Sequence, residues 1–355
     1  MRILIIKTSS LGDVIHALPV IAYLHRAFPA VELGWVVEAP FSDLLSGNPL
    51  LTRLHLINTR AWRKSPLSDR TRQEVSTLWR ELRGGGYDLL LDLQGNLKSG
   101  IIGLLTGINR RIGFPRQLLQ EPLNRFCTTE KALYSLEDNH ASLRCLSIAA
   151  VAAGLPYRDE EPVSDIAVGE ADRQQAEAVL RGVGSGKRLL FHCGTTWQTK
   201  FWTVDGWSRL GTQVCRTFPG STILLTYGSD IEQEMACQVA SCIEGNTRLV
   251  ERLPLKTLAA LMKQVDLVAG GDTGPVHLAA AVGTPTVSLY RSSDGSESGP
   301  RGSQHVIVQS PLSCTRCFRT SCSQDDECRA SITVEAMFAG IERLLRADGA
   351  VGLTS

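Results

Sequence analysis

A glycine-rich segment between an apolar run and a helical pattern is the first candidate for chemistry. Residues 270–277 read GGDTGPVH, after the run at 266–269 and before the small residues 278–282. A helix N-terminus attracts phosphate because it has unpaired N–H groups and a partial positive charge. Asp272 adds a carboxylate for sugar hydroxyls, and Thr273 adds a hydroxyl. An ordinary N-cap is the alternative, and this segment alone does not separate the two.

Two loops in the first half of the chain carry polar groups after apolar runs. In residues 7–13, KTSSLGD, Gly12 permits a tight turn, and Asp13 is either a general base or a helix cap. Residues 92–100, DLQGNLKSG, place Gln94 and Lys98 around a glycine. This second loop either binds a sugar or anion, or is a capped turn with a solvated lysine.

Two loops in the second half repeat the pattern. Residues 191–202 contain Gly194, Thr195, Thr196 and Lys200, whose hydroxyls and point charge could hold a diphosphate. Residues 227–232, YGSDIE, include an acidic residue that suits a ribose diol, as in dinucleotide-binding folds. A solvated lysine and an exposed carboxylate at a helix start are the respective alternatives.

Basic residues gather in the first half, with Trp62 among the first group. They suggest a patch for a phosphorylated or carboxylated acceptor, or a solvated face. These residues are Arg60, Arg63, Lys64, Arg110, Arg111 and Arg116.

Four cysteines follow one another closely near the C-terminus. They are Cys314, Cys317, Cys322 and Cys328. This spacing is compact enough for a tetrahedral structural zinc site, but its second half is irregular for a zinc ribbon. Free thiols are the alternative, and we expect no catalytic metal because no open-site histidine or carboxylate set accompanies the cysteines.

Composition limits the function classes. With 37 Lys and Arg against 36 Asp and Glu, the net charge is +1, so we expect no nucleic-acid partner. No stretch approaches the roughly 18–20 apolar residues of a membrane span. The apolar run at 3–6 is interpreted as a buried strand and not as an export signal, so ten cysteines predict thiols in the reducing cytoplasm.

Strand-like runs alternate with helical patterns throughout, which predicts an α/β protein with parallel sheets. The 355 residues favour two domains, 1–165 and 166–355, and the last helix (333–346) is a candidate to pack back on the first. Pro19 is expected to kink a helix over 14–26. The expected strands are 2–7, 33–38, 53–58, 87–93, 188–193, 221–227, 249–251, 266–269 and 285–290. Two such domains predict a ligand cleft at the carboxyl ends of the strands.

Taken together, these loops resemble glycosyltransferase family 9, the ADP-heptose:lipopolysaccharide heptosyltransferases. The matching segments occur in order along most of the chain: KTSSLGDV at 7–14, WVVE at 35–38, WRKS at 62–65, DLQG at 92–95, His140-Ala141 with Arg144, and DTG at 272–274 with His277-Leu278. Those at 35–38, 62–65 and 92–95 are most similar to the heptosyltransferase I branch. The resemblance implies a GT-B fold of two Rossmann-like domains, with the acceptor in the first and the nucleotide sugar in the second.

The resemblance also implies residue roles. Asp13 matches the proposed general base, and Lys200 would stabilise the leaving diphosphate. Donor contacts would come from Thr195, Thr196, Lys200, Gly228, Glu232, Asp272, Thr273, Gly274 and His277. Acceptor contacts would come from Ser10, Gly12, Arg60, Arg63, Lys64, Gln94 and Lys98.

The implied activity is an inverting, metal-independent transfer of heptose from ADP-heptose to a Kdo residue of Kdo-lipid A, without a cofactor, by a cytoplasmic protein peripheral to the inner membrane. A later core acceptor, another nucleotide sugar, or a non-catalytic binding protein are the alternatives. Two departures concern the acceptor most: Gln120 replaces an arginine before Glu121-Pro122, and RSSD at 291–294 replaces a GPTD-like turn.

Overall fold

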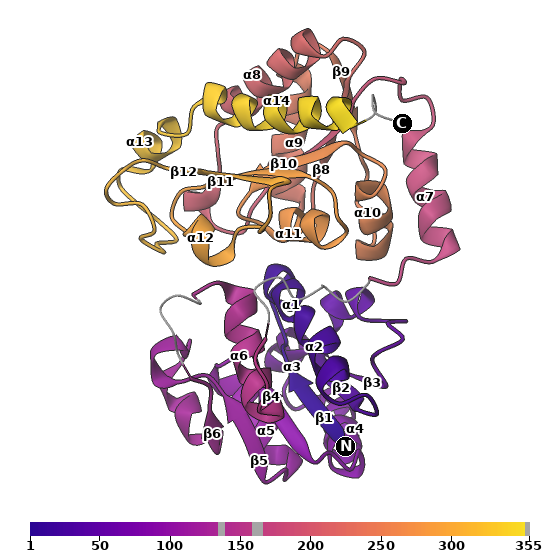
Figure 1. Cartoon of the computed structure of the whole chain (residues 1–355), viewed down its shortest axis with the longest axis vertical. Coiled ribbons are helices and arrows are strands. Elements are labelled where there is room, and N and C mark those ends of the chain that lie inside the picture. Colours follow the sequence, from indigo (N-terminus) through magenta and orange to yellow (C-terminus); the bar gives the residue numbers. More distant parts are fainter. Residues whose placement is uncertain (134–138, 158–165, 352–355) are drawn as a thin grey trace. The chain divides into compact units, whose positions relative to one another are not determined.

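The chain forms two compact units, Met1–Ala167 and Val168–Ser355, in a computed structural model that describes residues 1–133, 139–157 and 166–351. Each unit contains a six-stranded parallel sheet between helices (Figure 1). In both, the chain order of the strands across the sheet is 3-2-1-4-5-6, the Rossmann order. The expected pair of Rossmann-like domains is confirmed. The units divide after Ala167, beside the boundary predicted after residue 165.

The first unit has the sheet order β3-β2-β1-β4-β5-β6. Its strands are β1 (Arg2–Ile6), β2 (Glu32–Glu38), β3 (Arg53–Ile57), β4 (Leu89–Asp92), β5 (Arg110–Gly113) and β6 (Glu130–Lys131). Its helices are α1 (Leu11–Ala17), α2 (Pro19–Ala27), α3 (Thr59–Lys64), α4 (Asp69–Gly84), α5 (Leu97–Thr106) and α6 (Ala141–Ala153), with 3-10 turns η1 (Ala39–Leu44), η2 (Arg116–Leu118) and η3 (Pro122–Phe126).

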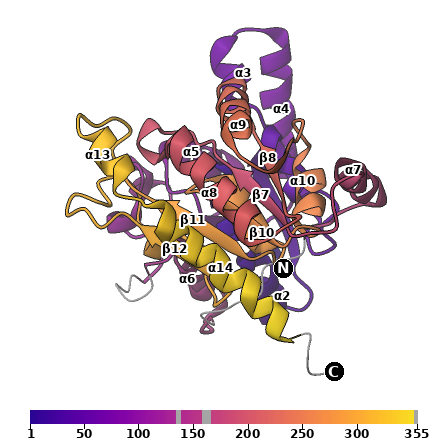
Figure 2. The ribbon, with the colours of Figure 1, turned by 90° about the horizontal axis from the view of Figure 1, so that it is seen from above.

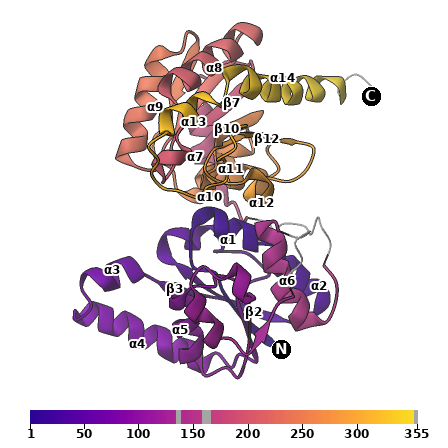
Figure 3. The same ribbon diagram turned by 90° about the vertical axis from the view of Figure 1, so that its left-hand side faces the viewer.

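Helices cover both faces of this sheet. Leu78 and Leu82 of α4 and Ile102 of α5 pack on one face, against β-strand residues that include Leu4 and Leu90. Helices α1, α2 and α6 contact one another on the other face, as Figure 3 shows. The fully buried runs of β1 and β4 follow from this two-sided cover.

The second unit has the sheet order β12-β11-β10-β7-β8-β9. Its strands are β7 (Arg188–His192), β8 (Thr222–Thr226), β9 (Asn246–Leu249), β10 (Leu267–Gly271), β11 (Thr286–Tyr290) and β12 (His305–Gln309). Its helices are α7 (Glu170–Leu180), α8 (Val204–Thr217), α9 (Asp230–Cys242), α10 (Leu255–Met262), α11 (Gly274–Ala281), α12 (Gly295–Ser298), α13 (Asp325–Ala330) and α14 (Val334–Val351), with the 3-10 turn η4 (Gln198–Lys200).

The final helix belongs to the core of this second unit. Met337 and Ile341 of α14 are fully buried with Trp207 of α8 and with strand residues of the sheet. Figure 2 shows α14 running beside α8 and over β10 and β11. The apolar stripe of this helix completes the cover of that sheet, while packing of the helix back on the first domain stays a prediction.

Several element predictions need correction. The strand predicted at 249–251 is β9, Asn246–Leu249, a short edge strand with its two end residues exposed and its two middle residues partly buried. Strands β5, β6 and β12 were not predicted, because they are short or carry polar residues at sheet edges. Pro19 does not merely kink a helix. It begins α2, with Leu18 shared between α1 and α2.

Candidate active site

A buried lysine in the loop after β1 pairs with a partly exposed carboxylate in the first turn of α1. Lys7 is 5 % exposed, and its Nζ lies 3.2 Å from Oδ1 of Asp13. The same Nζ donates to the carbonyl oxygen of Leu93, 2.9 Å away, in the loop after β4. Since β1 and β4 are neighbours, the lysine joins the two loops at the carboxyl edge of the sheet.

Both oxygens of the Asp13 carboxylate have partners. The backbone N–H and the hydroxyl of Ser10 each donate to Oδ2 at 2.9 Å, while Oδ1 faces Lys7. Ser10 is the N-cap of α1, and Asp13 is the third residue of that helix. Asp13 therefore belongs to the capping box of α1 but is not itself the N-cap residue. Burial alone would raise the pKa of Asp13, but Lys7 and the Ser10 hydrogen bonds outweigh it and lower the pKa to about 2.

Gln94 and Lys98, predicted as acceptor contacts, are engaged within the first unit. The Gln94 side-chain oxygen accepts from the Thr8 N–H at 2.9 Å, from its hydroxyl at 3.2 Å, and from the Ser9 N–H at 3.2 Å. Lys98 Nζ lies 2.8 Å from Oε1 of Glu38. Gln94 therefore shapes the loop that leads to Ser10, the N-cap of α1, and Lys98 is more accessible than Gln94.

The basic residues divide into two groups. Arg60, Arg63 and Lys64 are exposed on α3, which follows β3. Arg110 and Arg111, which the sequence groups with this patch, lie in β5 and not on α3. Arg110 pairs with Glu130 at 2.8 Å, and Arg111 donates to the carbonyl of Cys127 at 2.7 Å, so they hold the sheet edge instead. Arg116 lies apart from α3 in sequence, in η2.

The loops after β7 and β10 meet in the second unit through a charged cluster. Lys200 Nζ lies 2.6 Å from Oδ2 of Asp272, and Nε2 of His277 lies 3.4 Å from Oδ1. Lys200 also lies over the Trp197 ring, 4.5 Å from its centroid. Burial would raise the pKa of Asp272, but the His277 hydrogen bond and the Lys200 charge lower it well below its usual range. The cluster therefore keeps a buried carboxylate ionised.

The helix start predicted as a phosphate site is present. Thr273 is the N-cap of α11, yet its hydroxyl makes no capping hydrogen bond, and Gly274 is the first helical residue. A Cβ at Gly270 would meet the Val276 side chain at 2.6 Å, so glycine permits the close approach of strand and helix. Thr195 is buried and Thr196 is exposed in the loop after β7. Such a helix start suits an anion.

The loop after β8 reaches the end of β7. The Gly228 N–H donates to Oε2 of Glu232 at 2.6 Å, and Nε2 of His192 lies 3.9 Å from the same oxygen. A Cβ at Gly194 would lie 2.4 Å from the Glu232 side chain. Burial lowers the pKa of His192, against the opposing charge of Glu232. Glu232 thus packs closely against Gly194 and Gly228, at the same edge of the sheet as Lys200.

The segment after β11 explains one departure from the family pattern. Arg291 is 1 % exposed and its Nη2 lies 2.5 Å from Oδ1 of Asp325 on α13. Its carbonyl accepts from the Thr315 hydroxyl at 2.8 Å. Arg291 therefore anchors the cysteine-bearing segment, and we assign it a structural role.

Metal ligands do not gather in the described structure. Among residues 1–133, 139–157 and 166–351, no group of three or more His, Cys, Asp or Glu side chains could hold a metal ion. The four clustered cysteines are present as thiols, Cys314 and Cys317 exposed and Cys322 and Cys328 half-buried. The described residues therefore provide no ligand set for the zinc ion that the cysteine spacing would allow.

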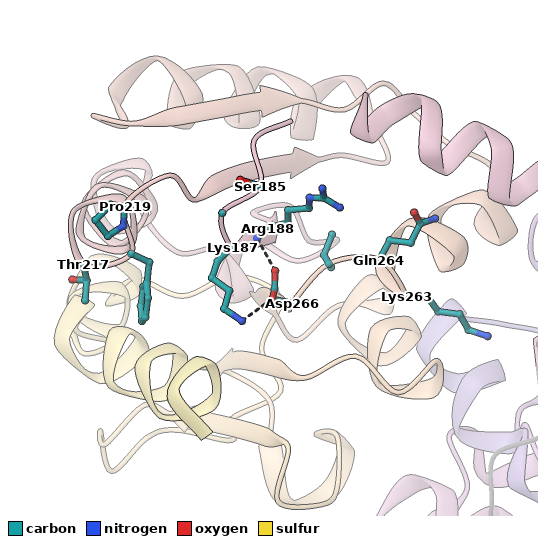
Figure 4. A pocket seen from close by; sticks show the side chains of 11 residues that line it. Ser185, Lys187, Arg188, Thr217, Pro219, Lys263, Gln264 and Asp266 are labelled. Carbon is teal, nitrogen blue, oxygen red and sulfur yellow. Dashed lines mark hydrogen bonds and ion pairs between the residues drawn. The ribbon is translucent and has the colours of Figure 1, made fainter. Parts of the chain in front are cut away.

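One surface pocket lies away from the predicted residues. Figure 4 shows it between Lys187, Arg188, Thr217, Lys263 and Asp266, with Asp266 bonded to Lys187 Nζ and to the Arg188 N–H. These residues are at the amino ends of β7 and β10, the edge opposite Lys200 and Asp272. Ligands of open parallel sheets bind beyond the carboxyl ends, so we place no donor site in this pocket.

Sequence reasoning gave no role to several residues that the structure brings into the site. Lys7 pairs with Asp13, His192 lies beside Glu232, and Glu38 holds Lys98. Lys7 and His192 are the polar residues that end or follow apolar strands, and that position is the signal that could have singled them out.

Comparison with known proteins decides the family. Residues 75–327 match the model of glycosyltransferase family 9 (heptosyltransferase). The chain belongs to this family. Lipopolysaccharide heptosyltransferase 1 of Pseudomonas aeruginosa is 33% identical over 324 residues, which cover 91% of this chain and 88% of that protein. Its counterpart in Escherichia coli K12 is 27% identical, over 88% of this chain and 94% of its own.

Solved structures agree with this family assignment. E. coli heptosyltransferase WaaC with ADP has a TM-score of 0.76 at 25% identity, covering 97% of this chain and 100% of that one. The same enzyme with ADP-2-deoxy-2-fluoro heptose has a TM-score of 0.75 at 26% identity, covering 97% and 99%. The resemblance inferred from the six motifs is therefore confirmed for this family 9 chain.

Proposed function

We propose that this family 9 protein transfers heptose from ADP-heptose to a Kdo residue of the lipopolysaccharide inner core, with Kdo-lipid A as the acceptor. The observation that carries the proposal is the Lys200–Asp272–His277 cluster at the loops after β7 and β10, in a chain 26% identical to an enzyme solved with an ADP-heptose analogue. Heptosyltransferase 1 relatives, matched over most of their length, give the acceptor class.

In this proposal the second unit binds the nucleotide sugar. The helix N-terminus at Thr273 and Gly274, with Thr195, Thr196 and Lys200, holds the diphosphate. Glu232, fixed by the Gly228 N–H, accepts from ribose hydroxyls, and Asp272 with His277 faces the heptose. Negative charge grows on the diphosphate as the glycosidic bond breaks, so Lys200 and the helix amides stabilise the transition state more than the ground state.

Asp13 of the first unit acts as the base. The acceptor hydroxyl oxygen forms a bond to the anomeric carbon while the bond from that carbon to the diphosphate oxygen breaks, and the hydroxyl proton passes to Asp13. Attack opposite the leaving group inverts the anomeric configuration, and ADP leaves. No metal is needed in this scheme, because Lys200 and helix amides meet the diphosphate charge.

The low pKa of Asp13, about 2, makes it a weak base. General bases work best with a pKa near the working pH, so Asp13 takes the proton late, when the attacking oxygen has become acidic through bond formation. Stabilisation of the leaving diphosphate must then supply the larger part of the rate enhancement.

The acceptor side is proposed from charge. Kdo is a carboxylated sugar, and the exposed Arg60, Arg63 and Lys64 of α3 supply cations for its acidic groups. Further contacts come from Ser10 and Gln94, in the loops after β1 and β4, and from Gly12 and Lys98, in the first turns of α1 and α5. An acceptor with a lipid moiety implies work at a membrane surface. In the described part of the chain no helix is long and apolar enough to cross a membrane. Because the proposed acceptor is lipid-linked, we propose peripheral contact at the cytoplasmic face of the inner membrane.

The test compares wild type with Asp13→Asn, using ADP-heptose and Kdo-lipid A, and measures both ADP release and ADP-heptose binding. We expect transfer to fall by about 10²–10⁴-fold while donor binding is kept, because a positioned base contributes on that order. Asp205→Asn, on an exposed carboxylate of α8, is the matched control.

The outcomes separate the alternatives. Undiminished transfer by Asp13→Asn would end the base assignment. A wild type that binds ADP-heptose but transfers to no Kdo-bearing acceptor would favour a later core acceptor. Binding without any transfer or hydrolysis would favour a nucleotide-sugar-binding protein.

A further inference from the structure

Helix α5 presents its apolar residues outward. Its exposed residues are Leu97, Ile101, Leu104 and Leu105, at spacings of four, three and one, which places them on one side of the helix. Its buried residues are mostly small or polar: Ser99, Gly100, Ile102, Gly103 and Thr106. A surface helix of a soluble domain normally shows the reverse arrangement, so this exposed stripe calls for a partner.

The stripe continues onto η3. A Cβ at Gly100 would meet Cys127 at 2.6 Å and Asn124 at 3.0 Å, so the helix lies directly against this turn. Leu123 and Phe126 of η3 are 61% and 67% exposed. Their exposure beside α5 extends the apolar surface beyond one helix.

The stripe also continues onto α4. Arg83 donates from Nε to the carbonyl oxygen of Leu105, 3.2 Å away. The Arg83 guanidinium lies over the ring of Trp79, 4.8 Å from its centroid, and Trp79 is 42% exposed. We call this surface the α5 face: Trp79, Leu97, Ile101, Leu104, Leu105, Leu123 and Phe126.

Cations border the α5 face. Arg83 lies at its α4 end, and Arg125 lies over the Phe126 ring, 4.5 Å from the centroid. Lys131 donates to the carbonyl oxygen of Arg125 at 2.9 Å. The carboxylate of Glu121 accepts from the Leu97 N–H at 2.7 Å, so this nearby negative charge is engaged at the helix start. Aromatic residues paired with arginines at the rim of an apolar stripe suit the headgroup region of a bilayer.

We propose that the α5 face docks on a bilayer containing anionic phospholipid. The apolar stripe enters the boundary between headgroups and acyl chains, while Arg83 and Arg125 meet lipid phosphates. Helix α5 itself carries Lys98 and begins just after the loop that carries Gln94, so a docked protein holds both residues near the lipid surface. The choice of bilayer rests on the proposed function, in which the acceptor is a lipid-linked sugar.

The rim charge favours a bilayer over a second copy of the chain. Two copies that pack α5 face on α5 face would bring Arg83 and Arg125 toward the same cations of the partner, which costs free energy. An anionic lipid surface neutralises them instead, and its attraction weakens with salt.

The experiment measures sedimentation of the full chain with sucrose-loaded vesicles of phosphatidylcholine, with or without about a third phosphatidylglycerol. We expect binding to anionic vesicles that falls by at least about tenfold in Ile101→Glu/Leu104→Glu, because two carboxylates enter the buried stripe. Phe126→Ser on η3 should weaken binding too. Leu56→Glu is the matched control, since Leu56 is 50% exposed on β3.

Activity on a soluble, deacylated Kdo acceptor separates this inference from the proposed function. The double variant should keep wild-type transfer to that acceptor, which also shows that it folds, and lose transfer to vesicle-bound Kdo-lipid A. Equal vesicle binding by wild type and both α5-face variants would overturn the inference. So would a wild type that ignores vesicles and forms a dimer that the double variant loses. Absence of transfer with vesicle binding intact would overturn only the proposed function.

Discussion

The Nζ atom of Lys7 lies 3.2 Å from Oδ1 of Asp13 and 2.9 Å from the carbonyl oxygen of Leu93. One buried ammonium thus fixes the orientation of the proposed base and joins two loops of the first unit. The same contact keeps Asp13 ionised and lowers its basicity. Lys7 therefore fixes the position of the Asp13 carboxylate and at the same time makes Asp13 a weaker base.

Lys7→Met should raise the pKa of Asp13 from about 2 toward or above the usual value of about 3.9, because burial then acts with less opposition. Carbon-detected NMR of the Asp13 carboxyl, titrated with acid, measures the change. Lys98→Met, which removes the partner of Glu38 instead, is the control. An Asp13 titration that is identical in wild type and Lys7→Met would refute the account of the pKa.

Gly194→Ala should weaken ADP binding several-fold. Its Cβ would lie 2.4 Å from the Glu232 side chain and displace the proposed ribose contact. Calorimetric titration with ADP measures the affinity. Gly84→Ala is the matched control, because a Cβ there has no atom within 4 Å. If both variants bind ADP like wild type, Glu232 does not hold the nucleotide.

The free energy of unfolding should fall as the pH falls from about 4 to about 2. The pKa of Asp13 is lowered in the folded state, so its contribution is complete above the unfolded pKa and is lost on acidification through the folded one. The contribution is on the order of 1 kcal/mol after allowing for solvent screening. Asp272, whose pKa is also lowered, makes the free energy of unfolding depend on pH in the same direction.

Urea unfolding at several pH values measures this slope. Asp272→Asn should unfold more easily at neutral pH and depend less on pH below 4, whereas the exposed Asp205→Asn should follow wild type. Burial lowers the pKa of His305 to about 4. His305 therefore affects the free energy of unfolding at higher pH, between about 6.5 and 4, and its effect is separate from that of the carboxylates. A slope unchanged by Asp272→Asn would contradict the assignment.

The cysteines should react in the order of their exposure. With a thiol reagent near pH 8, we expect Cys237, Cys242, Cys314 and Cys317 to react first. Cys145 and Cys193 should react only on unfolding, because burial raises the pKa of Cys145 to about 11 and that of Cys193 further.

Metal analysis of protein purified anaerobically without added zinc completes this test. We expect less than one metal ion per chain. A stoichiometric metal, with Cys314 and Cys317 protected until a chelator is added, would show that the cysteine series binds an ion.

The sequence alone predicted the α/β class, the two sheets and the family. Alternating apolar runs and helical patterns are local signals, so β1, β4, β7 and β10 could be located without a structure. The candidate site residues could then be located as well, because Asp13, Lys200 and Asp272 lie in the segments that follow β1, β7 and β10. Short edge strands such as β9 were misplaced or missed, since partly buried residues leave a weak pattern.

Only the tertiary structure decided what these side chains contact. Lys7 and Asp13 are close in sequence, but the Lys7 contact with Leu93 depends on the pairing of β1 with β4. Lys200 and Asp272 meet because β7 and β10 are neighbours, across 72 residues of chain. The outward apolar side of α5 also required the fold: the sequence shows only an apolar run at 101–105, and packing decides which of its residues reach solvent.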